Sequence, residues 1–132
     1  VELIAKIREV RKHAGMMVPR PIQSALAAAL QDDSHVLKQR ERYLNRRNLL
    51  TPALESAGFK VDFSDAGLYI WCTRTEDCWK SVEWLSQIGI LATPGIFYGP
   101  AGSQHIRVAL TASDQKIQEA AARVNTAIKS IK

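Results

Sequence analysis

The chain has 132 residues, 46% of them hydrophobic, and a formal net charge of +5. This length is typical of one domain that buries a core without disulfides or a metal ion. The 18 basic residues are interspersed with 13 acidic ones, an excess too mild to indicate a nucleic-acid-binding protein. No apolar run reaches the ~18 residues of a membrane span. Cys72 and Cys78 match neither a CxxC pair nor a zinc motif, which favours buried thiols in a reducing cytoplasm.

Two short helices are predicted at the N-terminus. An apolar stripe predicts a first helix from Glu2 to Ala14, which ends at Gly15. Two prolines predict an extended connector over residues 16–21, and an alanine-rich helix follows over residues 22–30. The chain begins inside the first apolar stripe with no capping residue before it, so we expect a fragment of a longer protein.

A long amphipathic helix is predicted after Asp32–Ser34, whose side-chain oxygens cap it. Gly58 ends this helix, and Pro52 predicts a kink or a short break near residues 49–51. The helix carries a basic run over residues 38–47. A solvated helix face explains this run, and a basic helical module that binds nucleic acid is the alternative function.

Two strands are predicted after this helix. Phe59, Val61 and Phe63 alternate with polar residues, which is typical of a half-buried strand. A turn over residues 65–67 leads to a second strand over residues 68–73, and we expect the two to pair antiparallel.

The rest of the chain predicts a helix, two strands and a final helix. Thr75 caps a helix that ends at Gly89, a third strand covers residues 90–93, and Ser113 opens the last helix after the fourth strand. Apolar residues form one stripe of the last helix: Ile117, Ala121, Val124, Ile128 and Ile131. This order predicts a two-layer α+β domain, with a small, mostly antiparallel sheet of three to four strands covered by helices on one face.

The fourth strand follows a loop rich in glycine and proline and contains a lone arginine, Arg107. Because Ile106 and Val108 face the helices, His105 and Arg107 face the other way. A guanidinium has a fixed charge and five donors, so this position is costly unless an anion meets it, and a planar carboxylate fits its fork. An intramolecular salt bridge and an exposed strand residue are the alternatives.

These features resemble the C-terminal small domain of fold-type I, class I/II aminotransferases, which use pyridoxal 5'-phosphate. The shared pattern consists of Pro94-Gly95, Tyr98-Gly99, Gly102 and Arg107. Three further segments agree: Ile22 to Leu26, Ala66 to Trp71, and Gly89 to Gly95. The resemblance implies that residues 1–132 form the small domain, that residues 1–15 are part of the interdomain helix, and that the large cofactor-binding domain is absent from this chain.

The resemblance also implies roles for single residues. In this family the strand arginine binds the substrate α-carboxylate, which assigns that role to Arg107, with Tyr98 and His105 as candidates for lining the pocket. Four loop residues are structural: Pro94, Gly95, Gly99 and Gly102. No catalytic, cofactor-binding or metal-binding residue is assigned to this chain, because the family's Schiff-base lysine lies in the large domain.

The full enzyme implied by the resemblance is a cytoplasmic homodimer that transfers an amino group between an amino acid and a 2-oxo acid. The loop and the Trp71-Cys72 neighbourhood are most similar to bacterial N-succinyldiaminopimelate aminotransferases of lysine biosynthesis, whose substrates are N-succinyl-LL-diaminopimelate and 2-oxoglutarate. Another class I/II subfamily is the alternative. We expect no membrane partner, no nucleic acid partner, and no activity from the 132-residue chain alone.

Overall fold

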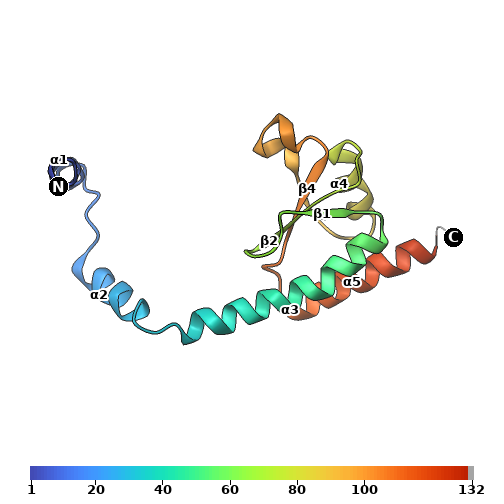
Figure 1. The fold of residues 1–132 in the computed structure, drawn as a ribbon, viewed down its shortest axis with the longest axis horizontal. Coiled ribbons are helices and arrows are strands. Elements are labelled where there is room, and N and C mark those ends of the chain that lie inside the picture. Colours follow the sequence, from blue (N-terminus) through green and yellow to red (C-terminus); the bar gives the residue numbers. More distant parts are fainter. Residues whose placement is uncertain (131–132) are drawn as a thin grey trace. The chain divides into compact units, whose positions relative to one another are not determined.

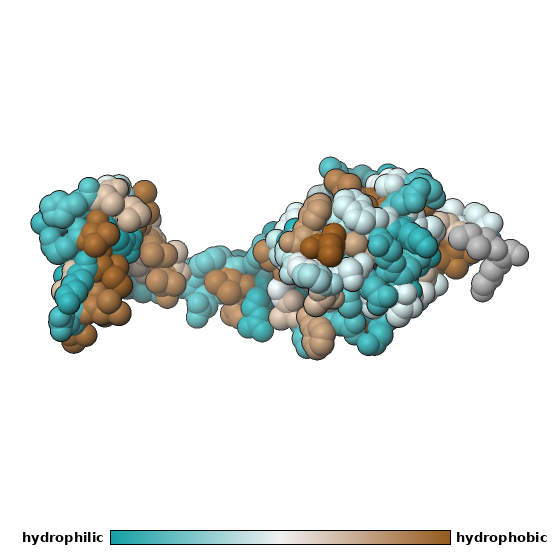
Figure 2. Space-filling model, turned by 90° about the horizontal axis from the view of Figure 1, so that it is seen from above, coloured by the Kyte–Doolittle hydropathy of each residue, from teal (hydrophilic) through white to brown (hydrophobic). Residues whose placement is uncertain are grey.

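The computed structural model describes residues 1–130 and contains two compact units, Val1–Leu37 and a second unit that starts at Lys38. The first unit holds α1 (Glu2–His13) and α2 (Arg20–Ala29), and neither helix has a buried residue. Apolar side chains gather on the surface of this unit (Figure 2). No helix among the described residues is long and apolar enough to cross a membrane.

The connector between α1 and α2 is shorter than the sequence predicts. Helix α2 begins at Arg20, so Pro21 belongs to its first turn and not to the connector. Proline is favourable there because its missing N–H has no partner in the first turn of a helix.

The second unit is built on a four-stranded antiparallel sheet with strand order β1-β2-β4-β3 (Figure 1). The strands are β1 (Lys60–Asp62), β2 (Tyr69–Thr73), β3 (Thr93–Pro94) and β4 (His105–Ala109). The helices are α3 (Ser34–Ser56), which starts in the first unit, α4 (Cys78–Gln87) and α5 (Asp114–Lys129). Two short 3-10 turns, η1 (Gly95–Tyr98) and η2 (Pro100–Gly102), lie between β3 and β4. The predicted order of elements and the α+β class are confirmed.

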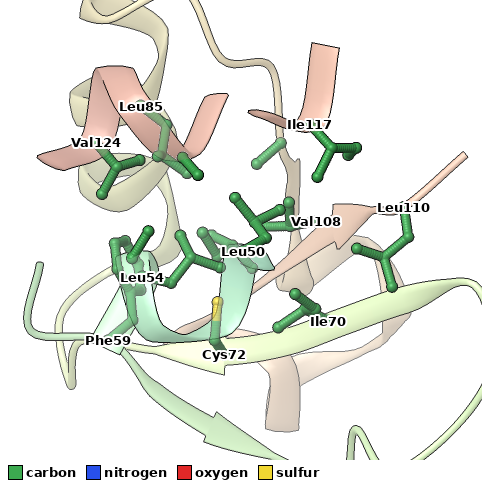
Figure 3. Packing of buried hydrophobic residues seen from close by; sticks show 14 of the residues in the cluster. Leu50, Leu54, Phe59, Ile70, Cys72, Leu85, Val108, Leu110, Ile117 and Val124 are labelled. Atoms are coloured by element: carbon green, nitrogen blue, oxygen red, sulfur yellow. The ribbon is translucent and has the colours of Figure 1, made fainter. Parts of the chain in front are cut away.

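The core lies between one face of the sheet and the helices (Figure 3). Alternate residues of β2 and β4 point into this core and pack against apolar side chains of the helices. The core includes Leu50, Leu54, Ile70, Cys72, Leu85, Ile106, Val108, Leu110, Ile117 and Val124. The two cysteines are free and buried, as predicted. Burial raises the pKa of the Cys72 thiol to about 12, mainly by desolvation of the thiolate.

The sequence predicts a kink or a short break near Pro52, and helix α3 continues through this residue without a break. Its last turns bury Leu50, Ala53 and Leu54 in the core, and this packing maintains the helix although proline donates no backbone hydrogen bond. The Pro52 carbonyl still accepts a hydrogen bond from the Ser56 hydroxyl at 2.8 Å. The sequence alone does not show this packing and so cannot exclude a break.

The predicted alternation fails at the end of β1. Phe63 is 96% exposed instead of facing the core, and its backbone is left-handed with φ 50. Ser64 is buried in its place. The Ser64 hydroxyl accepts a hydrogen bond from the Trp71 N–H at 2.8 Å and donates one to the Asp62 carbonyl at 2.9 Å. These bonds hold a conformation that costs a bulky residue about 1–3 kcal/mol.

The start of α4 also differs from the prediction. Asp77, and not Thr75, caps the helix by accepting a hydrogen bond from the Trp79 N–H at 2.8 Å. Thr75 has φ 57 and lies in the preceding loop. A left-handed residue cannot serve as the cap because an N-cap residue adopts an extended conformation.

The third strand is shorter than predicted, and the last helix starts where predicted. Only Thr93 and Pro94 pair with β4, so residues 90–92 of the expected strand form a loop, in which Leu91 is 90% exposed and Ala92 is buried. Ser113 caps α5 by accepting a hydrogen bond from the Lys116 N–H at 3.3 Å. Ile131, assigned to the apolar stripe of this helix, lies outside the described residues.

Replacing a core leucine tests this packing. Leu85 is fully buried, so Leu85→Ala is expected to lower the free energy of unfolding by about 2–5 kcal/mol, the usual cost of a cavity. Leu91→Ala is the matched control, because Leu91 is exposed and its loss should change stability by less than about 0.5 kcal/mol. Urea denaturation of the 132-residue chain measures both, and equal losses would contradict the packing described.

Candidate functional site

Arg107 lies in the middle of β4 on the sheet face that turns away from the core. Its direct neighbours across the sheet are Trp71 in β2 and Thr93 in β3. Within residues 1–130 no carboxylate forms an ion pair with its guanidinium, and its buried Nε has no hydrogen-bond partner. The salt-bridge alternative is therefore not realised in the part of the chain that the structure describes, and an uncompensated cation faces outward.

Two tyrosine rings flank the guanidinium. Its Cζ lies 4.1 Å from the ring centroid of Tyr69 and 5.1 Å from that of Tyr98. Contacts of this kind attract a cation by about 0.5–2 kcal/mol through the ring quadrupole. They hold the side chain in place but leave its charge unneutralised.

An open pocket of about 440 Å³ lies beside Arg107. Its walls come from the β1–β2 turn, from β2 and from η1, and the lining residues are Phe63, Ser64, Ala66, Gly67, Leu68, Tyr69, Trp71, Tyr98 and Arg107. Arg107 is the one charged residue among them. The structure thus brings Tyr98 and Arg107 together in one pocket.

His105 shares the sheet face of Arg107 but is not part of the pocket wall. Its ring stacks on Trp71, with centroids 5.2 Å apart and planes 8° apart, and its Nε2 lies 3.2 Å from Asp62 Oδ2. Trp71 in turn meets the Tyr98 ring edge-on at 5.8 Å. His105 therefore supports the aromatic wall from behind.

The loop before β4 depends on a close backbone contact between Gly95 and Gly102. A Cβ on Gly95 would lie 2.5 Å from the His105 carbonyl oxygen and 2.8 Å from the Trp71 ring, and a Cβ on Gly102 would collide with the Gly95 backbone. Gly99 has φ 115, a conformation that side chains disfavour. The folded loop carries Tyr98 to Arg107, and Pro94 anchors its start by pairing with Ile106 of β4.

Two arginines of the basic run in α3 have partners inside the protein. Arg46 donates to Asp114 Oδ1 at 2.6 Å and to the Leu110 carbonyl at 2.8 Å. Arg47 donates to the Gly67 carbonyl at 2.7 Å and so holds the turn that forms one side of the pocket. These contacts weaken the nucleic-acid alternative, because the run is not a continuous row of free cations.

The described residues show neither a metal centre nor an anchor for a Schiff base. Within residues 1–130 no group of three or more His, Cys, Asp or Glu side chains lies close enough to hold a metal ion. Every lysine in this part of the chain is exposed. A Schiff-base lysine needs a desolvating pocket or a neighbouring cation to lower its pKa, so these residues do not fit pyridoxal phosphate.

Sequence reasoning missed three residues of the pocket: Phe63, Tyr69 and Trp71. Tyr69 and Trp71 lie opposite Ala109 and Arg107, which is a consequence of the β2–β4 register. Knowledge of that pairing would have identified both, because cross-strand neighbours on one face are in contact.

The ion pairs beneath Trp71 predict a dependence of stability on pH. The Lys60 ammonium, 2.8 Å away, and then the His105 ring lower the pKa of the Asp62 carboxyl. A carboxyl whose pKa is lower in the folded than in the unfolded protein stabilises the fold at pH values above its unfolded pKa, about 4. This stabilisation is lost as the pH falls below about 4 and through the folded pKa. The Tm of the 132-residue chain should therefore fall on acidification from about pH 5 to pH 3, and less steeply in Asp62→Asn.

Asp65→Asn is the control for this measurement, since Asp65 is an exposed turn residue and forms no ion pair with other described residues. The Tm of Asp65→Asn should fall with decreasing pH as steeply as the Tm of the unmodified chain. An Asp62→Asn variant with that same slope would show that the ion pairs do not contribute.

Comparison with known proteins shows the family to which this chain belongs. The profile of the family "aminotransferase class I and II" matches residues 2–124. A probable aminotransferase of Mycobacterium tuberculosis is 60% identical over 124 residues, which cover 94% of this chain and 30% of that protein. The 4-dedimethylamino-4-oxo-anhydrotetracycline transaminase of Streptomyces rimosus is 54% identical over 122 residues, 92% of this chain and 34% of that protein. The chain spans about a third of the length of these curated relatives.

Solved structures share the fold. An aminotransferase from Neisseria meningitidis superimposes with a TM-score of 0.84 at 28% identity, over 96% of this chain and 34% of that one. N-succinyldiaminopimelate aminotransferase from Mycobacterium tuberculosis has a TM-score of 0.75 over 95% of this chain and 35% of that one, and at 23% identity this likeness shows the fold alone. The chain belongs to the class I and II aminotransferase family.

Proposed function

We propose that this chain is the small domain of a longer aminotransferase and that Arg107 binds the α-carboxylate of the amino acid or 2-oxo acid substrate. The observation that carries the proposal is the guanidinium itself, which two tyrosines hold beside an open pocket and which no carboxylate of residues 1–130 neutralises. Its planar fork matches a carboxylate through two charge-assisted hydrogen bonds. Such a contact orients the substrate for reaction.

In this proposal the remaining part of the enzyme binds pyridoxal 5'-phosphate, because the residues described here offer no anchor for it. When bound, that cofactor supplies the electron sink for breaking the bond to the substrate α-carbon. Residues 1–132 form the small domain, with residues 1–15 in the interdomain helix. The full enzyme is a cytoplasmic homodimer, and the 132-residue chain alone is inactive.

We further propose N-succinyl-LL-diaminopimelate and 2-oxoglutarate, in lysine biosynthesis, as the substrates. The similarity of the loop and of the Trp71-Cys72 neighbourhood to that subfamily supports this assignment. The Streptomyces rimosus relative, named as a tetracycline-precursor transaminase, represents another subfamily and defines the competing assignment.

A donor panel tests the substrate assignment. The full-length protein, loaded with pyridoxal phosphate and supplied with 2-oxoglutarate, is expected to use N-succinyl-LL-diaminopimelate with the highest kcat/KM among amino donors. Formation of glutamate measures the rate for each donor. Efficient turnover of other donors but not of this one would overturn the substrate and leave the role of Arg107 in place.

The role of Arg107 is tested with Arg107→Lys in the full-length protein. Lysine keeps the charge but loses the bidentate fork, so kcat/KM should fall by the equivalent of about 2–4 kcal/mol. Arg40→Lys is the control, because Arg40 is exposed on α3 and should tolerate the change. Unchanged steady-state kinetics in Arg107→Lys would remove the proposed role.

A further inference from the structure

Phe63 occupies a position that the packing of the described residues does not explain. Its side chain lines the pocket beside Arg107 and is 96% exposed, so its ring gains almost nothing from burial in this part of the chain. Its backbone is left-handed, with φ 50, which is rare for a bulky residue. Both features are unfavourable, and an outlier of this kind beside a pocket suggests a role in binding.

The conformation of Phe63 is imposed from both ends of the β1–β2 turn. On one side, the Ser64 hydroxyl bonds to the Trp71 amide and to the Asp62 carbonyl. On the other side, the Arg47 guanidinium holds the Gly67 carbonyl. These bonds therefore fix the turn backbone that places Phe63 in the lining of the pocket.

The chemistry of the pocket indicates what such a ring would meet. Arg107 supplies one site for a carboxylate, and the rest of the wall is uncharged, mostly aromatic or aliphatic, with hydroxyls on Ser64, Tyr69 and Tyr98. The Ser64 hydroxyl is already engaged with backbone groups. No second cation lines this pocket, so a second carboxylate close to the first would find no counter-charge there.

We propose that Phe63 is a specificity-determining residue that packs against the apolar part of a substrate whose carboxylate is bound by Arg107. The site then favours amino acids with an alkyl or aryl side chain over alanine and aspartate. The alkyl chain of a diaminopimelate derivative meets this requirement, and so does an aromatic side chain. This inference rests on the proposed function of Arg107.

The test compares phenylalanine with alanine as amino donors of the full-length protein. In Phe63→Ala the ratio of their kcat/KM values should fall about tenfold, mainly through the KM for phenylalanine, because the variant loses an apolar contact that only the larger substrate makes. Phe63→Leu should keep most of the ratio. Phe97→Ala is the matched control, since Phe97 is an exposed aromatic residue of the same domain that does not line this pocket.

A binding measurement separates this inference from the function on which it rests. Titration calorimetry of the full-length protein measures its affinity for 3-phenylpropionate and for propionate, two carboxylates that do not react. Phe63→Ala should weaken binding of 3-phenylpropionate alone, whereas Arg107→Lys should weaken binding of both. If Arg107→Lys leaves both affinities unchanged, the proposed function fails, whatever Phe63 does.

The competing explanation is that another part of the longer protein covers Phe63. Phe63→Gly tests it, because glycine adopts the left-handed conformation without strain. For a substrate contact, the Tm of the full-length protein stays the same or rises while the selectivity for phenylalanine falls. A lower Tm, with equal losses for phenylalanine and alanine, would show that Phe63 is a packing residue and overturn the inference.

Discussion

The antiparallel pairing of β2 with β4 determines where each group of the candidate site lies. Its register places Trp71 opposite Arg107 and buries Ile70 and Val108 as a pair on the other face. A slip by one residue would turn Arg107 into the core, where an unpaired charge costs several kcal/mol. Apolar burial on one face and the cation on the other therefore select the same register. Packing and binding chemistry are not independent here, because one set of strand contacts establishes both.

The way in which Arg107 is held decides what it can bind. A carboxylate partner within the protein would hold the guanidinium but would also occupy its donors and neutralise its charge. The rings of Tyr69 and Tyr98 restrict the side chain and leave the charge available. Tyr98 keeps its place because the backbones of Gly95 and Gly102 touch in the folded loop. The ordering of the cation is thus completed during folding, which lowers the entropy lost on binding.

Local sequence signals predicted much of the fold, and contacts between distant residues account for the rest. Strand alternation placed Arg107 on the outward face, and Gly89 marked the end of α4, because both depend only on neighbouring residues. The reversal at Phe63 depends on a bond between Ser64 and the amide of Trp71, seven residues away. The two tyrosines meet Arg107 only through strand pairing and loop closure, which a linear pattern does not contain. The loop pattern therefore pointed to Arg107 and Tyr98, whereas the rest of the aromatic wall, Phe63, Tyr69 and Trp71, was not predictable.

The distribution of buried residues shows which part of the chain maintains the site. Every fully buried hydrophobic residue among those described lies at Leu50 or beyond it, and α1 and α2 bury none. Helices of 12 and 10 residues have little stability in water without tertiary packing. The second unit, which contains the hydrophobic core, also contains the pocket, the glycine loop and the ion pairs of Asp62. The geometry around Arg107 is consequently a property of that unit, and changes in the two N-terminal helices should leave it intact.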